Sequence, residues 1–473
     1  MNQMIPTRRG LDRAIDLANR ARRDVPAYAE FLDQHGVTCE VEGRDDFATL
    51  PATTKVEYLQ RYSIPQLMWD CDVSAAGSWS ATSGSTGNPT FFPRDDVALN
   101  DSTRFYGRIL EENFGIGDQT TLVIVCFAMG TWIGGTYTYQ TFLELRRHGR
   151  RISLTTTGID VDAAVRNLTE LGPHYEKVIL AGYPPLIKDV LDRAGESALA
   201  QDLYLLLAGE AIGEGWRDHL LNRIGHPDRP ERVCLMYGTA EAGVMGHETP
   251  ATVRIRRAAR PGTLLAWKLF GDKGTRLPTF VAVDPESRYV EVVEGFLLFT
   301  IDSTMPLIRY RINDRGGVFT ADRLRAVLTV CGYPELAEDV DPAAVYVVLA
   351  GRTDVATTFY SSNIYVGHLA EAFDDSLVTA RVTGRFVVDG TPDESHEPVL
   401  RIDVELSAGG SADDELAALL TSLCVESLTS NNDEYRTMRA AHGECTIPRI
   451  KLHPYGTGPF GAVSVKHNYV GGN

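Results

Sequence analysis

The chain has 473 residues, of which 44% are hydrophobic and 23% are charged. These values are typical of a folded protein, and the length exceeds what one hydrophobic core usually serves, so we expect two or three domains. The formal charge is −17 at pH 7, which argues against nucleic-acid binding because that function needs a basic face. We take the cluster Arg254, Arg256, Arg257 and Arg260 as the most basic stretch and expect it to be a solvated loop.

The sequence contains no stretch that predicts a membrane span or a secretory signal. The longest apolar run, 122–130, has nine residues, about half of what a bilayer requires. The first 24 residues mix charged and apolar side chains, which favours an amphipathic helix. The cysteines number 7 and include no CxxC pair, so neither a disulfide framework nor a zinc ribbon is indicated. We expect a cytoplasmic protein, and the sequence leaves its oligomeric state open.

Residues 118–241 alternate apolar, β-rich runs with helix-like stretches. The strand-like runs are 121–127, 177–181, 203–208 and 232–236, and the helix-like stretches are 184–193 and 213–224. Such alternation is typical of a parallel sheet with helices on its faces. Glycine follows each strand-like run, and ligands bind at the carboxyl ends of parallel strands. The pattern therefore predicts an α/β fold with a binding crevice at that edge of the sheet.

The second half of the chain changes character twice. After residue 260 it is β-rich, with strand-like runs at 279–283, 289–293, 296–300, 307–311 and 346–350. Beyond residue 351 there are strand-like runs at 386–388 and 399–406 and a helical stretch at 413–428. We predict a large N-terminal domain over 1–350, with parallel sheets and a β-rich portion. A hinge at 351–354 and a small, mobile α+β C-terminal domain over 355–473 are predicted to follow.

The strongest functional signal is the segment 80–89, which reads SATSGSTGNP. Hydroxyl groups and glycines in such a loop suit phosphate, because successive backbone N–H groups can form an anion nest and the hydroxyls can donate further hydrogen bonds. A GxxxxGK[ST] loop is absent from the sequence. The predicted phosphate-binding residues are Thr82, Ser83, Gly84, Ser85, Thr86 and Gly87.

This loop resembles the phosphate loop of the adenylate-forming ligases, the superfamily of acyl-CoA synthetases, luciferases and adenylation domains. Three further blocks follow in that family's order: YGTAE at 237–241, MPLIRYRIND at 305–314 and GRTD at 351–354. The second block is similar to that of phenylacetate–CoA ligases and coenzyme F390 synthetases, and LPATTK at 50–55 also resembles the former. The resemblance covers the whole chain. It implies an enzyme that uses ATP and Mg²⁺ to form an acyl-adenylate, releases pyrophosphate and passes the acyl group to a nucleophile.

Three residues are expected to act in adenylation. Glu241 is a carboxylate beside a glycine turn at a strand's end, which suits a ligand for Mg²⁺; a carboxylate favoured by a helix N-terminus is the alternative. Thr239 resembles the residue that hydrogen-bonds the α-phosphate. The resemblance also implies a lysine from the C-terminal domain at the bridging oxygens. Lys466 matches that lysine, and Lys451 is the other candidate.

The resemblance also assigns residues to the nucleotide, with Tyr237 offering a flat face to adenine. The other nucleotide-binding residues expected from it are Gly209, Glu210, Ala211, Gly238, Asp314 and Arg352. Asp314 is expected at the ribose hydroxyls and Arg352 at ribose or phosphate, although ordinary salt bridges would also explain both.

A group of mostly aromatic residues after the first strand-like run predicts the acyl pocket. Its members are Phe127, Met129, Trp132 and Tyr137. If these side chains line the pocket, they favour a flat aryl acid; packing in the core is the alternative explanation.

Two departures from the family concern the acceptor. The segment 361–367 reads SSNIYVG, so the first glycine and the proline of the family's GxNxxP segment are missing. The stretch after YGTAE holds His247 but no cysteine, so we predict no zinc. Both departures weaken the case for CoA and leave an amine as acceptor open. Activation of nitrite for diazotisation of an aryl amine is an alternative. So is a catalytically silent homologue that only binds nucleotide or an acyl group.

Overall fold

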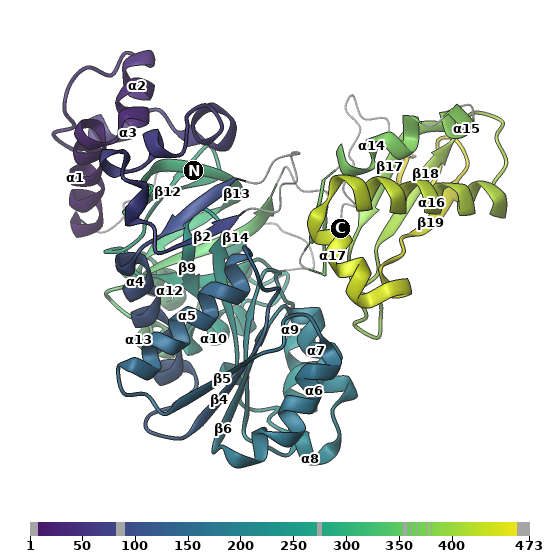
Figure 1. Ribbon diagram of the computed structural model, residues 1–473, viewed down its shortest axis with the longest axis horizontal. Coiled ribbons are helices and arrows are strands. Elements are labelled where there is room, and N and C mark those ends of the chain that lie inside the picture. Colours follow the sequence, from purple (N-terminus) through teal and green to yellow (C-terminus); the bar gives the residue numbers. More distant parts are fainter. Residues whose placement is uncertain are drawn as a thin grey trace. The chain divides into compact units, whose positions relative to one another are not determined.

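The structure is a computed structural model that describes residues 8–81, 90–271, 277–352, 357–360, 362–365, 367–374, 376–379 and 381–460 (Figure 1). It contains two compact units: the first ends at Arg352, and the second comprises the described residues after Arg352 together with the short segment Tyr183–Leu186. Within the described residues, no helix combines the length and apolar character that crossing a membrane requires. The predicted segments Thr82 to Gly87 and the one carrying Lys466 lie outside the described residues.

The first unit is built on a 12-stranded sheet whose parallel half matches the predicted strand–helix alternation. Its strands β5, β4, β6, β7 and β8 lie side by side in that order, all parallel. Their bounds are Thr121–Cys126 (β4), Ile152–Thr156 (β5), Lys177–Gly182 (β6), Leu203–Ala208 (β7) and Val233–Thr239 (β8). All six residues of β4 are buried, as expected for a strand covered on both faces.

The antiparallel half of the sheet continues from β8 through β9, β10, β14, β13 and β12 to β11, and β1 pairs with β13 off this path. The bounds are Thr53–Thr54 (β1), Gly243–His247 (β9), Thr279–Val283 (β10), Tyr289–Val293 (β11), Phe296–Ile301 (β12), Leu307–Thr320 (β13) and Val345–Arg352 (β14). The β-rich portion predicted after residue 260 is thereby confirmed, and it belongs to the same sheet as the parallel strands. A separate hairpin, β2 (Ser78–Ala81) with β3 (Phe91–Arg94), flanks the predicted phosphate loop.

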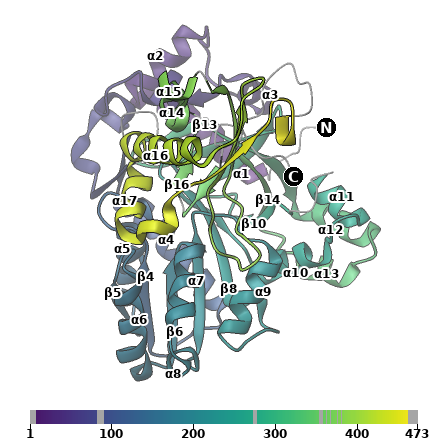
Figure 2. The same cartoon turned by 90° about the vertical axis from the view of Figure 1, so that its right-hand side faces the viewer.

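Helices cover both faces of the parallel strands. In Figure 1, α4 and α5 lie on one side of these strands and α6 and α9 on the other, and Figure 2 gives the view at right angles. The helix bounds are Asp96–Arg108 (α4), Ile133–Arg147 (α5), Val161–Glu170 (α6), Pro184–Arg193 (α7), Glu196–Leu199 (α8), Glu214–Arg223 (α9), Pro250–Ala258 (α10), Leu264–Phe270 (α11), Ala321–Val330 (α12) and Pro334–Glu338 (α13). The predicted helices at 184–193 and 213–224 correspond to α7 and α9.

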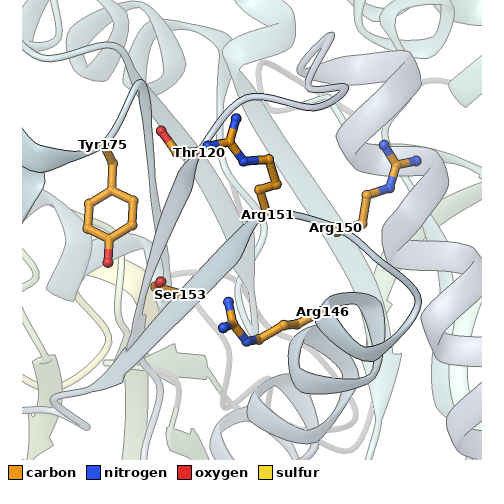
Figure 3. Close-up of a pocket in the computed structure, with 6 residues that line it drawn as sticks. All are labelled: Thr120, Arg146, Arg150, Arg151, Ser153 and Tyr175. Carbon is orange, nitrogen blue, oxygen red and sulfur yellow. The ribbon is translucent and has the colours of Figure 1, made fainter.

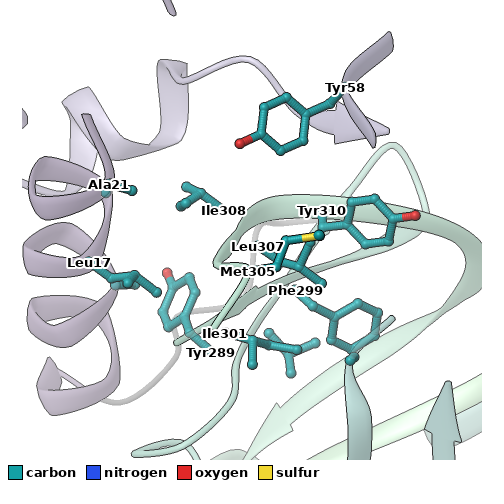
Figure 4. Close-up of a cluster of buried hydrophobic side chains, with 14 of the residues drawn as sticks. Leu17, Ala21, Tyr58, Tyr289, Phe299, Ile301, Met305, Leu307, Ile308 and Tyr310 are labelled. Carbon is teal, nitrogen blue, oxygen red and sulfur yellow. The ribbon is translucent and has the colours of Figure 1, made fainter. Parts of the chain in front are cut away.

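The N-terminal helices pack on the antiparallel half of the sheet. They are α1 (Arg8–Asp24), α2 (Pro26–Gln34) and α3 (Arg44–Thr49). Leu17 and Ala21 of α1 belong to the same buried cluster as Phe299 and Ile301 of β12 (Figure 4). Residues such as Leu17 and Ala21 recur at helical spacing on one face, so the amphipathic helix predicted from the sequence is confirmed.

Two of the blocks that resemble the family are structural partners of each other. β1, within LPATTK, pairs with β13, and the Thr53 hydroxyl donates to the Ile308 carbonyl at 2.8 Å. The buried Arg309 guanidinium contacts Glu291 at 2.6 Å and donates to the Ala48 carbonyl at 2.7 Å. Burial raises the pKa of the Glu291 carboxyl despite this cation. These contacts hold the N-terminal segment on the strand that carries Asp314.

The second unit is a small α+β structure, as predicted. Its three-stranded sheet has the order β17, β18, β19, with β17 antiparallel and β19 parallel to β18. The strand bounds are Thr357–Phe359 (β15), Ser362–Ile364 (β16), Val382–Asp389 (β17), Arg401–Leu406 (β18) and Arg449–His453 (β19). The helix bounds are Gly367–Asp374 (α14), Ser376–Thr379 (α15), Asp414–Asn431 (α16) and Asp433–His442 (α17). The buried residues Leu416, Leu420, Cys424 and Leu428 recur along one face of α16.

The expectation that the cluster from Arg254 to Arg260 is a solvated loop is wrong. Most of it lies in α10, and the Arg256 side chain is 1% exposed. Its guanidinium contacts Glu214 at 2.7 Å and donates to the Ile212 carbonyl at 2.7 Å. Buried carboxylates therefore compensate this cation. The sequence pattern gave no sign of them, because Glu214 lies 42 residues away.

Candidate active site

Loops that follow parallel strands meet at one edge of the first unit. Parallel β4, β7 and β8 all end there, so the segments 127–132, 209–211 and 237–241 share this edge. The hairpin of β2 and β3 reaches the same place, because the Ala81 amide donates to the Thr131 carbonyl at 2.9 Å. Ala81, which precedes Thr82, is thus tied to the crevice edge predicted from the sequence.

The loop after β4 packs closely on the first turn of α5. A Cβ atom on Gly135 would lie 2.3 Å from the Ala128 carbonyl oxygen and 2.8 Å from the Met129 sulfur. Only glycine allows this approach, so a larger residue would push the loop away from the helix. The glycines of the WIGG sequence therefore fix the loop that carries the predicted acyl-pocket residues.

The four predicted acyl-pocket residues differ in burial. Phe127 and Tyr137 are buried, Trp132 is half-buried and Met129 is exposed. The Tyr137 hydroxyl donates to the Ala98 carbonyl at 2.6 Å and accepts from the Ser102 hydroxyl at 2.8 Å. Burial raises the pKa of Tyr137. These contacts hold Tyr137 against α4 and leave Trp132 and Met129 as the more accessible members of the group.

The end of β8 brings two predicted nucleotide-binding residues together. The Tyr237 hydroxyl donates a hydrogen bond to the Asp314 carboxylate from 77 residues away. Asp314 is nearly buried on β13, in register with Arg352 on β14. Between Tyr237 and Thr239, a Cβ atom on Gly238 would lie 2.8 Å from the Gly243 carbonyl oxygen. The glycine is therefore needed where β8 and β9 approach each other.

Thr239 and Glu241 lie in the turn between β8 and β9. The Thr239 side-chain oxygen accepts a hydrogen bond from the Ala242 amide at 3.0 Å and closes the turn. Its hydroxyl proton remains a donor, because a hydroxyl accepts and donates independently. The half-buried Glu241 carboxylate has no hydrogen-bond or ion-pair partner within the part of the chain that the structure describes. Both groups are available to a ligand at this edge.

Arg94 is a residue of this site that the sequence pattern did not reveal. It is 4% exposed at the end of β3. Its guanidinium donates to the main-chain carbonyls of Ala240 and Glu241, the latter at 3.3 Å. The arginine that follows the predicted phosphate loop thereby holds the turn carrying Glu241. Nothing in a single sequence connects positions 147 residues apart.

Arg94 lies among charged groups of both signs. Burial lowers its pKa, and the neighbouring Arg288 lowers it further, whereas Tyr137 and Glu241 act in the opposite direction. Arg288 is also buried, and its guanidinium lies 3.7 Å from the Asp101 carboxylate. Two buried arginines therefore lie beside the Glu241 turn, and nearby carboxylates oppose the charge of each.

The remaining predicted residues lie at the same edge or in the second unit. The segment Gly209, Glu210 and Ala211 follows β7, with Gly209 at φ +98°, a conformation that glycine adopts readily. Lys451 is exposed on β19. Ser362 is buried, and its hydroxyl donates to the Asn432 side chain at 3.2 Å. This part of the segment that departs from GxNxxP is thus held by polar contacts within the second unit.

A preformed cluster of three or more His, Cys, Asp or Glu side chains able to hold a metal is absent from the described residues. His247, which follows the predicted metal residue Glu241 by one short stretch of sequence, lies on β9 with its ring against Phe105 at 4.7 Å between centroids. Neither of its ring nitrogens has a hydrogen-bond partner among the described residues. Burial, with Arg108 nearby, lowers the pKa of His247 to about 3.

His247 is expected to make folding dependent on pH. Its folded pKa lies below the unfolded value of about 6.5, so its contribution is complete above that pH and is lost as the pH falls toward 3. At about pH 4.5 the free energy of unfolding should have fallen by roughly 2.5 kcal/mol from this residue. Urea titrations at several pH values should show a smaller pH dependence for His247→Phe than for the unsubstituted chain. Equal dependence would contradict the assignment, and His174→Phe at an exposed position is the control.

Comparison with known proteins was made with sequences and with structures. No family model and no curated protein matches the chain. Three crystal structures of 2-hydroxyisobutyryl-CoA ligase resemble it. The first, in complex with 2-HIB-AMP and CoA in the thioesterification state, is 17% identical with a TM-score of 0.61 over 98% of this chain and 88% of that one. An open conformation with the same ligands is 17% identical with a TM-score of 0.53, covering 89% of each chain. A postadenylation state with R3-HIB-AMP is 14% identical with a TM-score of 0.51, covering 98% and 88%. The chain therefore shares the fold of 2-hydroxyisobutyryl-CoA ligase.

Proposed function

We propose that the chain is an ATP- and Mg²⁺-dependent ligase that activates a small acid as its adenylate and passes the activated group to a nucleophile. The observation that carries this proposal is the hydrogen bond between Tyr237 and Asp314. It joins two separate blocks of the sequence resemblance at the sheet edge where Thr239 and Glu241 lie. The described structures of 2-hydroxyisobutyryl-CoA ligase, which contain adenylates, support the same activity.

Glu241 fits the role of the Mg²⁺ ligand. Mg²⁺ is commonly bound by one or two carboxylates together with substrate phosphates, so a preformed protein cage is not needed. The Glu241 carboxylate is available, and Arg94 fixes its turn through main-chain contacts only. When bound, Mg²⁺ would neutralise phosphate charge. The Thr239 hydroxyl would then donate to the α-phosphate, and Lys466, or alternatively Lys451, would approach the bridging oxygens.

The site, the sequence and the related structures bear on which acid is activated and which acceptor is used. Trp132 and Met129 are the accessible members of the predicted acyl pocket and support a flat aryl acid. CoA is present in the first of the solved structures described above, which supports CoA as acceptor. The missing glycine and proline of the segment 361–367 favour an amine instead. Nitrite belongs among the candidate acids because the segment 361–367 departs from the family's GxNxxP pattern.

The test is ATP–pyrophosphate exchange with a panel of aryl acids, aliphatic acids and nitrite. Exchange that depends on one acid class identifies the activated substrate, since only an adenylate formed from it returns label to ATP. Product formation with CoA or an amine, once the acid is known, identifies the acceptor. Binding of ATP without exchange across the panel would instead support the catalytically silent homologue.

Tyr237→Phe is expected to weaken nucleotide use without unfolding the chain. The variant keeps the aromatic face and removes only the hydroxyl that orients Asp314. A hydrogen bond to a charged group contributes about 1.5–3 kcal/mol, so kcat/KM for ATP should fall by about tenfold or more. Tyr455→Phe, at an exposed position, is the control. An unchanged kcat/KM in Tyr237→Phe would remove this contact from the nucleotide site.

A further inference from the structure

A second site is present in the first unit, at the opposite edge of the parallel strands. A pocket with a volume of about 390 Å³ is lined by Thr120, Arg146, Arg150, Arg151, Ser153 and Tyr175 (Figure 3). Thr120 precedes β4 and Arg151 precedes β5, so the pocket opens at the amino ends of these strands. The candidate active site is at their carboxyl ends, about 20 Å away along a six-residue strand.

Two arginines of this pocket donate hydrogen bonds to main-chain carbonyls and form no ion pair within the described residues. Arg146 donates to the Ile152 carbonyl at 2.6 Å and Arg151 to the Asp118 carbonyl at 3.4 Å. A carboxylate within ion-pair distance of either guanidinium is absent from the described residues. Each guanidinium has five N–H donors, so most of them remain for a ligand. Glu176 is an opposing charge near Arg151: hydrogen bonds from Thr120, followed by the charge of Arg151, lower the pKa of the Glu176 carboxyl.

The third arginine has a different role. Arg150 forms an ion pair with Glu111 and donates to the Gly117 carbonyl at 3.3 Å. In Figure 3 its guanidinium points away from the other pocket residues, whereas that of Arg146 points toward Ser153 and Tyr175. Arg146 and Arg151 are therefore the two cations offered to a ligand, and the hydroxyls of Ser153 and Tyr175 are further donors.

The local charge is unusual for this chain. The segment 146–151 reads RRHGRR within a protein of charge −17, so it, rather than the cluster around Arg256, is the most basic stretch. The carboxyl end of α5 favours cations and explains Arg146 and Arg147 in part. It does not explain Arg151, which begins the next strand beyond the turn. In Figure 3 the Arg151 guanidinium lies beside Thr120, on the rim of the same pocket that Arg146 lines.

We propose that this pocket binds the phosphate group of a small molecule, independently of the ATP that the candidate active site uses. Guanidinium groups bind phosphate through paired, charge-assisted hydrogen bonds, and two of them with two hydroxyls match its several acceptor oxygens. The volume is within the range of small-molecule sites, and the Tyr175 ring supplies a flat wall beside the arginines. Binding here is a function additional to adenylation.

Titration calorimetry with inorganic pyrophosphate tests the proposal. A saturating non-hydrolysable ATP analogue and Mg²⁺ occupy the candidate active site during the titration. The unsubstituted chain should bind one pyrophosphate, and the double variant Arg146→Ala/Arg151→Ala should bind it at least about tenfold more weakly. Arg147→Ala is the matched control, because Arg147 belongs to the same basic segment but pairs with Glu144 and does not line the pocket. It should bind normally.

The possible outcomes separate the two sites. Equal pyrophosphate affinity in all three proteins, or no binding by the unsubstituted chain, would overturn the proposal. Binding of a polyglutamate peptide through the same two arginines, without pyrophosphate binding, would overturn it in favour of an acidic protein partner. Acid-dependent ATP–pyrophosphate exchange should be retained by the double variant, since the substituted residues lie at the other edge of the sheet. Failure of the ATP analogue to bind would contradict the adenylating function but not pyrophosphate binding in this pocket.

Discussion

Glu241→Ala is expected to lower the rate of ATP–pyrophosphate exchange by a factor of about 100 or more while leaving the fold intact. Phosphoryl chemistry of this kind depends on positioning and on neutralising phosphate charge. Removing the carboxylate takes away the proposed protein anchor for Mg²⁺. The turn itself should persist, because Arg94 and Thr239 hold it through the main-chain groups of residues 240–242.

This substitution separates a metal-binding role from a structural one. Glu241→Gln preserves size and hydrogen bonding but not charge, and should lose nearly as much activity as Glu241→Ala if the carboxylate binds Mg²⁺. Raising the Mg²⁺ concentration should restore part of the activity of both variants. Exchange close to that of the unsubstituted chain, in variants with unchanged thermal midpoints, would exclude Glu241 as the metal ligand. Glu286→Ala, at a surface position, is the control.

The parallel half of the sheet could be predicted because its strands are continuous apolar runs. β7 was predicted with the bounds Leu203–Ala208 that the structure has. β13 was predicted only over 307–311, whereas it extends to Thr320. Its second part contains Gly316 and Gly317 and several polar residues, which disfavour a strand locally. Pairing with β14 over this stretch overrides that preference.

The sequence could predict a residue of the candidate site only where the residue's type and its position after a strand indicated a chemical role. Tyr237 and Asp314 were assigned to the nucleotide from separate blocks, and the structure brings them into contact. Arg94 was missed, because its importance comes from the main-chain carbonyls of Ala240 and Glu241. Arg94 stands alone before the acidic residues at the beginning of α4, and no sequence pattern there indicates such a contact.

Glu248 carries the largest expected effect on stability. Its carboxylate and the Arg217 guanidinium are both 0% exposed and form two hydrogen bonds, at 2.8 and 2.7 Å. Burial alone would lower the pKa of Arg217, but Glu248 and Glu214 outweigh burial and raise it. Glu248 also accepts from the Leu235 amide at 3.1 Å and lies 3.7 Å from Arg256. It therefore compensates two buried cations and holds the beginning of β8.

Glu248→Gln is expected to reduce the free energy of unfolding by about 3–5 kcal/mol, measured by urea denaturation. Removing one partner of a buried ion pair leaves charge uncompensated, and here two buried arginines each lose one of their two carboxylates, with Glu214 as the other. Glu231→Gln is the matched control, since its partner Arg229 is 60% exposed and the pair should contribute less than about 1 kcal/mol. A similar small loss in both variants would mean that Glu214 alone neutralises Arg217 and Arg256.

Because β8 ends in the Tyr237–Thr239 segment, Glu248→Gln should also weaken ATP binding at temperatures where the variant remains folded. Unchanged ATP affinity would show that the nucleotide edge is held independently of the buried charges at the other end of the strand.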